Sequence, residues 1–262
     1  TALQFTENGA AIIIGDSLTI TDVDDTNIDS AIIRISKNYD YITNSPSTNK
    51  PINLGDSLFF AAGVPAGITA YYTYGANTGD SITLGGSATL ANYKTALSKL
   101  TFKNNSDDPT NNDTKLSRTI EFLVRDNNSD NLGNQWSTVI TRKLNIIPTA
   151  DTAKLADTRT LEYRYTRVIK AAGIVFGDSL TITDADDTNL DSVVVRIDSY
   201  FFAGDSLFFS AASKKVLTTN SIVSSFGGGS TDSILTLSGS ANIDSYLLAL
   251  GGLTFKHTTV DV

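Results

Sequence analysis

The feature that most constrains the fold of this chain is an internal repeat. Residues 15–35 read GDSLTITDVDDTNIDSAIIRI and residues 177–197 read GDSLTITDADDTNLDSVVVRI, with 16 of 21 positions identical and the other five exchanging apolar residues. The match resumes at GDSLFF, residues 55–60 and 204–209. Since these blocks occur in the same order in both copies, the sequence predicts that one structural unit has been duplicated.

A third pair of blocks, residues 82–106 and 235–259, indicates a short helix in each copy. Elsewhere apolar residues alternate, as Ile33 and Ile35 do, which is typical of strands with one buried face. The helical spacing is carried by Leu90, Tyr93, Leu97 and Leu100, and by Ile243, Tyr246, Leu247 and Leu250.

The first copy continues with two alternating segments, residues 116–125 and 135–147, which predict a closing hairpin. The second copy has no such hairpin, since the position equivalent to Ser106 is Thr259. A sheet without these strands leaves backbone groups unpaired. Two interpretations stay open: the chain is cut at this point, or a neighbouring molecule supplies a strand and polymerises the protein.

Composition excludes several classes of function. The net charge of −8, from 28 acidic and 20 basic residues, argues against nucleic acid as a partner. Cysteine is absent, so disulfides and thiolate metal sites are excluded. No apolar run approaches the roughly 18 residues of a membrane span, so no membrane insertion of this segment is expected.

Four blocks resemble the cadherin-like repeats of giant bacterial surface and adhesin proteins. They read FTENGAAIII, LTITDVDDTNIDSAIIRI, GDSLFF and LTLSGSANIDSYLLALGGLTF, and the RTIEFLVRD and STVITRKLNI segments fit the same pattern. The resemblance covers nearly all of residues 3–148 and about two-thirds of a second unit. It implies immunoglobulin-like sandwiches with Greek-key topology, arrayed as extenders and often stiffened by calcium.

We therefore expect an all-β fold: two tandem Greek-key β-sandwich domains, each with one short helix, the second lacking its closing hairpin. The expected boundaries are residues 1–148 for the first, complete repeat, 149–154 for the linker and 155–262 for the second repeat.

Two acidic segments are candidate calcium sites. TDVDDTN (residues 21–27) and TDADDTN (residues 183–189) concentrate short oxygen ligands at a strand end, as calcium requires. The alternative interpretation is that these residues cap turns by accepting hydrogen bonds from their own backbone. The candidate ligands are Asp22, Asp24, Asp25 and Asn27, with Asp184, Asp186, Asp187 and Asn189.

Three further acids belong to the same hypothesis. Glu7 looks like the acidic residue that cadherin-like domains place near their calcium cluster. Asp126 and Asp130, in the predicted hairpin turn, could approach the same end of the domain. The second copy has no acid at the place of Glu7, which weakens the case for a calcium site between the repeats.

No catalytic constellation emerges from the sequence. The single histidine, His257, aligns with Asn104 and is interpreted as an ordinary strand residue. No serine lies in a nucleophile elbow. Tyr71, Tyr72 and Tyr74, with Trp136, could stack on a carbohydrate, although strand packing explains them as well.

We therefore expect a non-enzymatic, extracellular, cell-surface module that works as an extender repeat of a bacterial adhesin. One alternative is a self-assembling subunit of a surface layer or filament, completed by strand donation. Another is a calcium-dependent ligand- or carbohydrate-binding module. The expected partners are neighbouring repeats or subunits of the same protein, and a cell-surface or carbohydrate ligand.

Overall fold

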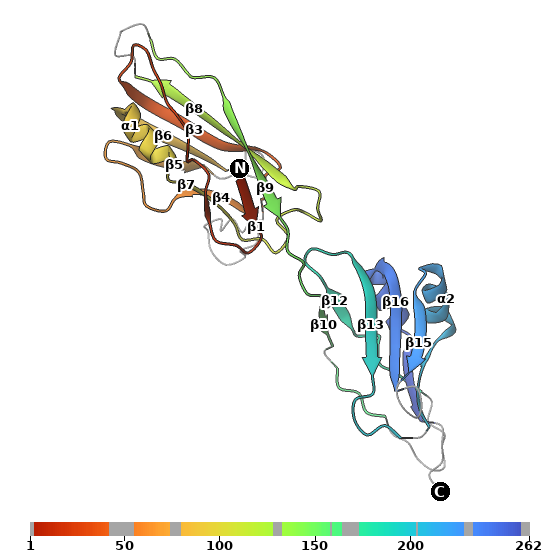
Figure 1. Cartoon of the computed structure of the whole chain (residues 1–262). Coiled ribbons are helices and arrows are strands. Elements are labelled where there is room, and N and C mark those ends of the chain that lie inside the picture. Colours follow the sequence, from red (N-terminus) through yellow and green to blue (C-terminus); the bar gives the residue numbers. More distant parts are fainter. Residues whose placement is uncertain are drawn as a thin grey trace. The chain divides into compact units, whose positions relative to one another are not determined.

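The protein is described by a computed structural model that covers residues 3–41, 55–73, 80–127, 133–157, 159–163, 173–202, 204–227 and 233–257. The chain divides into two compact units, Thr1–Ala150 and Asp151–Val262. Strands dominate both units and the helices are short (Figure 1). The all-β expectation is confirmed at this level.

The first unit is built from two sheets. The larger contains, in spatial order, β1 (Leu3–Thr6), β9 (Ile140–Ile147), β8 (Ser117–Asp126), β3 (Asn27–Lys37), β6 (Ser81–Thr89) and β5 (Thr69–Thr73). The smaller contains β2 (Ile12–Ile13), β7 (Leu100–Asn104) and β4 (Asp56–Phe60). All neighbours are antiparallel except β1 and β9, which run parallel.

The predicted closing hairpin is formed by β8 and β9. Their register runs from Ser117 opposite Asn145 to Phe122 opposite Ile140. The second strand begins at Ile140, later than the alternation suggested, and Trp136 joins the sheet only through a bridge to Arg125. The hairpin places β8 directly beside β3, at the centre of the larger sheet.

One apolar core fills the space between the two sheets of this unit. Ile33 and Ile35 of β3 are buried together with Leu58 of β4, and the rings of Phe5 and Phe102 meet edge to face at 5.2 Å. Each such side chain contributes about 1.5–3 kcal/mol by leaving water. The alternation read from the sequence therefore identifies the core face of these strands.

A short helix follows the same strand in both units, as the sequence predicts. These helices are α1 (Leu90–Leu97) and α3 (Ile243–Leu250). The buried Tyr93 donates its hydroxyl to the carbonyl of Gly86 at 2.8 Å, and Tyr246 does the same to Gly239 at 2.7 Å. Both glycines have positive φ, 121° and 133°, a conformation that other residues rarely adopt.

The second unit repeats the strand pairing of the first. Val193 lies opposite Leu237 as Ala31 lies opposite Leu84, and a bulge interrupts both pairs at the equivalent place. The strands are β13 (Asn189–Arg196), β16 (Ile234–Asn242) and β15 (Val223–Gly227), then β11 (Ile174–Val175), β17 (Leu253–His257) and β14 (Asp205–Phe209), and lastly β10 (Lys154–Ala156) with β12 (Thr181–Thr183).

The second unit contains two helices, so the expectation of one helix per domain is wrong there. The additional helix, α2 (Ala211–Thr219), follows β14, and Ser210 caps it by accepting from the amide of Ser213 at 3.1 Å. Its apolar stripe is short, so the spacing of apolar residues in the sequence did not predict it. In the first copy this place reads AAGVPAGIT, where glycine and proline disfavour a helix.

The two units differ most at the strand that follows the acidic segment. β3 is paired on both edges, to β6 and to β8, whereas β13 pairs only with β16 among the described residues. Ala31 and Ile33 are fully buried, but the equivalent Val193 and Val195 are half-buried. Within the described part of the second unit, no strand occupies the place that β8 has in the first.

Among the described residues, no helix is both long enough and apolar enough to cross a membrane.

We expect Gly86→Ala to destabilise the first unit by about 1–3 kcal/mol. A Cβ there would overlap the carbonyl oxygen of Gly67, in addition to the strain at positive φ. Gly133→Ala is the matched control, because Gly133 also has positive φ but open space around it. Urea unfolding followed by the fluorescence of Trp136 measures both variants, and equal losses would contradict the steric argument.

Candidate functional site

The first acidic segment forms a capped turn directly before β3. Oδ1 of Asp22 accepts from the amide of Asp25 at 2.8 Å and from that of Asp24 at 3.3 Å. The hydrogen bond from the Asp25 amide lowers the pKa of Asp22. The carboxylate oxygens of Asp22, Asp24 and Asp25 lie within 4.8 Å of one another. This triad therefore has both a structural role and a concentration of negative charge.

The second acidic segment repeats this turn before β13. Oδ1 of Asp184 accepts from the amides of Asp186 and Asp187 at 3.3 and 3.1 Å. Asp186 also accepts from the amide of Asp151, at 3.2 Å to each oxygen. Partial burial, and then the neighbouring Asp184, raise the pKa of Asp186. These three carboxylates also lie within 4.8 Å of one another.

The two asparagines of the predicted sites are the first residues of β3 and β13, the strands that follow the acidic segments. Asn27 begins β3 and donates its side-chain amide to Oγ of Ser87 at 3.4 Å. Asn189 begins β13 and is exposed.

Asp126 lies at the same end of the sheet as the first triad, because it is opposite Ile28. Its two oxygens accept from the backbone amide of Gln135 at 2.8 and 3.0 Å, which ties the end of β8 to residue 135. Asp130 lies outside the described residues.

Glu7 does not lie near the first triad. It follows β1, whose end at Thr6 is opposite Ile147, the last residue of β9, so it belongs to the opposite end of the sheet. The two ends of the sheet are about 30 Å apart, which is the length of the ten-residue strand β8. Oε2 of Glu7 accepts from the amide of Thr149 at 2.8 Å. The parallel pairing of β1 with β9, which the sequence did not indicate, explains this position.

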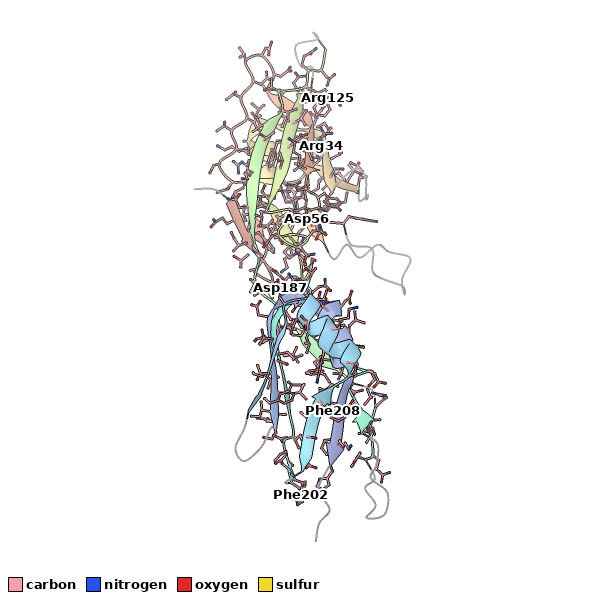
Figure 2. The ribbon with its side chains drawn as sticks, turned by 90° about the vertical axis from the view of Figure 1, so that its right-hand side faces the viewer. Arg34, Asp56, Arg125, Asp187, Phe202 and Phe208 are labelled. Atoms are coloured by element: carbon pink, nitrogen blue, oxygen red, sulfur yellow. The ribbon has the colours of Figure 1, made fainter. Side chains whose placement is uncertain are left out.

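The strongest electrostatic feature is a buried network that the sequence did not reveal. Arg118, at the start of β8, is fully buried, and its Nε donates to Oδ2 of Asp56 on β4. Its other nitrogens donate to the carbonyls of Lys115 at 2.8 Å and Pro109 at 2.6 Å. The ion pair therefore fastens the closing hairpin to the smaller sheet. Asp56 is labelled in Figure 2.

Further groups complete this network around Asp56. The side-chain amide of Asn104 donates to Asp56 at 2.9 Å and to Asp40 at 3.0 Å. Burial raises the pKa of Asp56, against the opposing effect of Arg118. Burial also raises the pKa of Asp80, to about 6, although Tyr39 donates its hydroxyl to it at 2.8 Å. The side chains of Asp40, Asp56 and Asp80 are therefore buried inside the first unit and do not line an open site.

The second unit replaces this network with a histidine–aspartate pair. Nδ1 of His257 lies 2.8 Å from Oδ1 of Asp205, and the pair occupies the strand positions of Asn104 and Asp56. Asp205 also accepts from the amide of Phe202 at 2.9 Å. The sequence alignment identified the position of His257 but not this contact.

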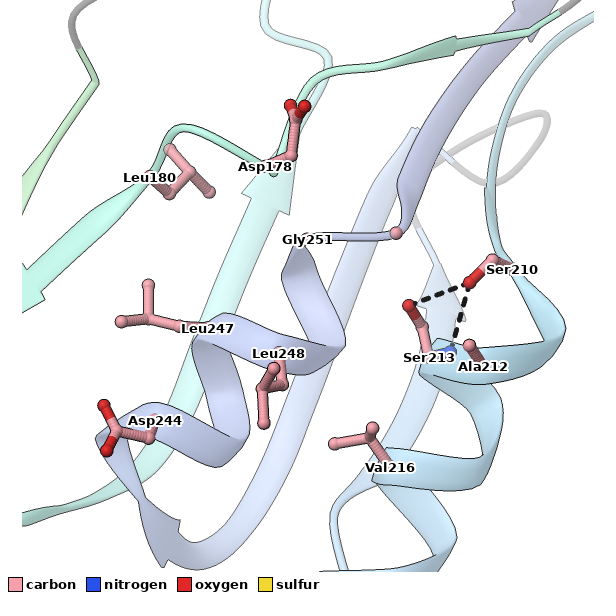
Figure 3. A pocket seen from close by; sticks show the side chains of 12 residues that line it. Asp178, Leu180, Ser210, Ala212, Ser213, Val216, Asp244, Leu247, Leu248 and Gly251 are labelled. Carbon is pink, nitrogen blue, oxygen red and sulfur yellow. Dashed lines mark hydrogen bonds between the residues drawn. The ribbon is translucent and has the colours of Figure 1, made fainter.

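A groove of about 800 Å³ lies between α2 and α3 (Figure 3). Ser210 and Ser213, at one wall, bond to each other at 3.1 Å and cap α2. Leu247 and Leu248 of α3 line the other wall. The serine hydroxyls are thus engaged in local structure, and no histidine is among the described residues that line the groove.

The exposed aromatic residues do not form one surface. Tyr71 and Tyr72 belong to β5, whereas Trp136 pairs with β8 on the side away from β3, which is four strand spacings from β5, or about 19 Å. The guanidinium of Arg125 lies 5.4 Å from the centre of the Trp136 ring. Tyr74 lies outside the described residues. The hypothesis of a shared carbohydrate platform gains no support from this arrangement.

Comparisons with protein-family models, curated proteins and solved structures give no match to this chain.

Arg118→Met should destabilise the first unit by about 3–5 kcal/mol, because it leaves the Asp56 carboxylate buried and unbalanced. Arg34→Met is the matched control: its pair with Glu121, at 2.7 Å, is half-exposed and is expected to cost about 0–1 kcal/mol. Urea unfolding monitored by Trp136 fluorescence gives both values. Similar losses would mean that the buried pair has no special role.

Asp22→Ala is expected to destabilise the first unit by about 1 kcal/mol, since it removes the acceptor of two amides. Asp22→Asn keeps an acceptor oxygen and should stay within about 0.5 kcal/mol of wild type in chelator. Thermal unfolding with and without calcium compares the variants. A calcium-dependent gain in wild type that Asp22→Asn abolishes would show that the triad also holds a cation.

Proposed function

We propose that this chain is a non-enzymatic structural module, an extender segment of a bacterial extracellular surface protein. In this proposal each unit is a Greek-key β-sandwich, and the two act in tandem. The observation that carries it is the repetition of one strand register, bulge included, in both units. Tandem repetition of one structural unit is typical of extended proteins.

The position of the first and last strands of the first unit supports a role under tension. β1 and β9 are parallel neighbours, with Leu3 opposite Leu144 and Thr6 opposite Ile147. A force that pulls the start of β1 away from the end of β9 loads all their hydrogen bonds together, in shear. Such a unit resists stretching along the chain better than one whose bonds open singly.

The remaining parts of the proposal rest on the sequence blocks. Their resemblance to cadherin-like adhesin repeats favours an extracellular, cell-surface location and neighbouring repeats as partners. Calcium at the triads of Asp22 and Asp184 is a proposed cofactor, supported by three clustered carboxylates in each unit. Carbonyl and water oxygens would have to complete the six to eight ligands that calcium takes.

Single-molecule stretching of the full chain tests this proposal. Pulled from its two termini, the first unit should unfold at a distinct force peak, because β1 and β9 are sheared. The chain has no cysteine, so Thr138→Cys provides a unique second attachment point just before β9. Pulling between the N-terminus and residue 138 opens the same strands from one end, and a severalfold lower force is expected.

Equal forces in the two directions would contradict the proposed mechanical role. So would the absence of any resolvable peak for the first unit when it is pulled from its termini.

A further inference from the structure

Three carboxylates lie buried together in the first unit, around the start of β4. Asp56 begins this strand, Asp80 directly precedes β6, and Asp40 lies after the end of β3. Their exposed fractions are 0%, 1% and 8%. The backbone amide of Asp40 donates to Oδ2 of Asp56 at 2.8 Å, and Oδ2 of Asp80 accepts from the amide of Leu58 on the same strand at 3.1 Å. We call these three acids the carboxylate cluster.

The carboxylate cluster contains more acids than the cations around it can pair. Arg118 donates its Nε to Asp56, and its other nitrogens donate to backbone carbonyls. Nζ of Lys115 also donates to a carbonyl, that of Tyr39, at 3.3 Å. Among the ion pairs of the described residues, none includes either of the other two carboxylates. One guanidinium is therefore paired within a group of three buried acids.

Asp80 is the member of the cluster whose contacts most favour a bound proton. Its Oδ1 accepts from the hydroxyl of Tyr39 at 2.8 Å, and its second donor is the amide of Leu58, so both donors are neutral. A buried carboxylate without a cation is ionised only at a cost in desolvation, which a proton removes. Burial, with a smaller effect of the charge of Asp56, therefore raises the pKa of Asp80 to about 6.

The second copy forms the same backbone contacts without the additional acids. Phe202 donates its amide to Asp205 as Asp40 does to Asp56. Ser233 stands in the place of Asp80, and its carbonyl accepts from the strand amide that aligns with the one bound to Asp80. Phenylalanine and serine carry no charge at these two places. The repeat therefore reaches this arrangement without the two acids, and their charge is a property of the first unit alone.

We propose that the carboxylate cluster is an acid-responsive latch, in which a proton bound at Asp80 stabilises the first unit in mildly acidic surroundings. The step is electrostatic, because a neutral Asp80 no longer repels the carboxylate of Asp56. Asp56 then stays ionised against Arg118, and the contact between β4 and β8 is strengthened. The protonated carboxyl keeps acceptor capacity for its two donors. This device goes beyond the proposed mechanical role and does not depend on it.

The folded and unfolded chains bind this proton in different pH ranges. The pKa of Asp80 is about 6 in the folded unit, against an ordinary value of 3.8. Since the folded state binds more protons between these values, stability rises as the pH falls through 6 and levels off below about 4. Carboxylates with a lowered pKa, such as Asp22 and Glu121, act in the opposite direction at lower pH. The difference between wild type and Asp80→Asn isolates the effect of Asp80.

Urea unfolding of the full chain at pH 7 and pH 5, followed by Trp136 fluorescence, tests the latch. Relative to Asp80→Asn, the unfolding equilibrium constant of wild type should fall about tenfold from pH 7 to pH 5. Asp107→Asn makes the same change at an exposed carboxylate of this unit and should keep the wild-type response. An equal response of wild type and Asp80→Asn would overturn the proposal.

A direct titration keeps the proposal testable even where Asp80→Asn fails to fold. With aspartate labelled at its carboxyl carbon, NMR of the folded chain should show a resonance that titrates near pH 6. Tyr39→Phe should move this midpoint to higher pH, because it removes a hydroxyl that favours the ionised form. The same variant should leave Asp186 in the second unit unchanged. No resonance that titrates near pH 6 and responds to Tyr39→Phe would contradict the latch.

Discussion

The buried contact between Arg118 and Asp56 is the constraint on which the first unit depends. It joins β8 of the larger sheet to β4 of the smaller one, where both side chains are fully buried. Two charges in such a place are tolerated only when every polar group around them has a partner. Asn104 and the carbonyls of Lys115 and Pro109 provide these partners. The packing of β8 against the smaller sheet therefore depends on this polar contact as well as on the burial of apolar side chains.

The repeat, the strands and the two homologous helices could be predicted because they depend on local periodicity and on comparison of one copy with the other. The contact of Arg118 with Asp56 could not, since 62 residues separate them and the aligned blocks of the two copies do not include Arg118. Glu7 was expected near the first triad, which is the wrong end of the sheet, because similarity between sequence blocks does not show the direction in which a strand runs. The parallel pairing of β1 and β9 decides it.

Both copies use the first aspartate of the acidic segment in the same way. Asp22 and Asp184 each accept two backbone amides ahead of the long strand, so the turn is specified without any ion. The clustering of three carboxylates is a consequence of this turn and of its charged sequence. Calcium binding, where it occurs, would add to a geometry that the chain already has, and the turn alone accounts for the short spacing of the acids.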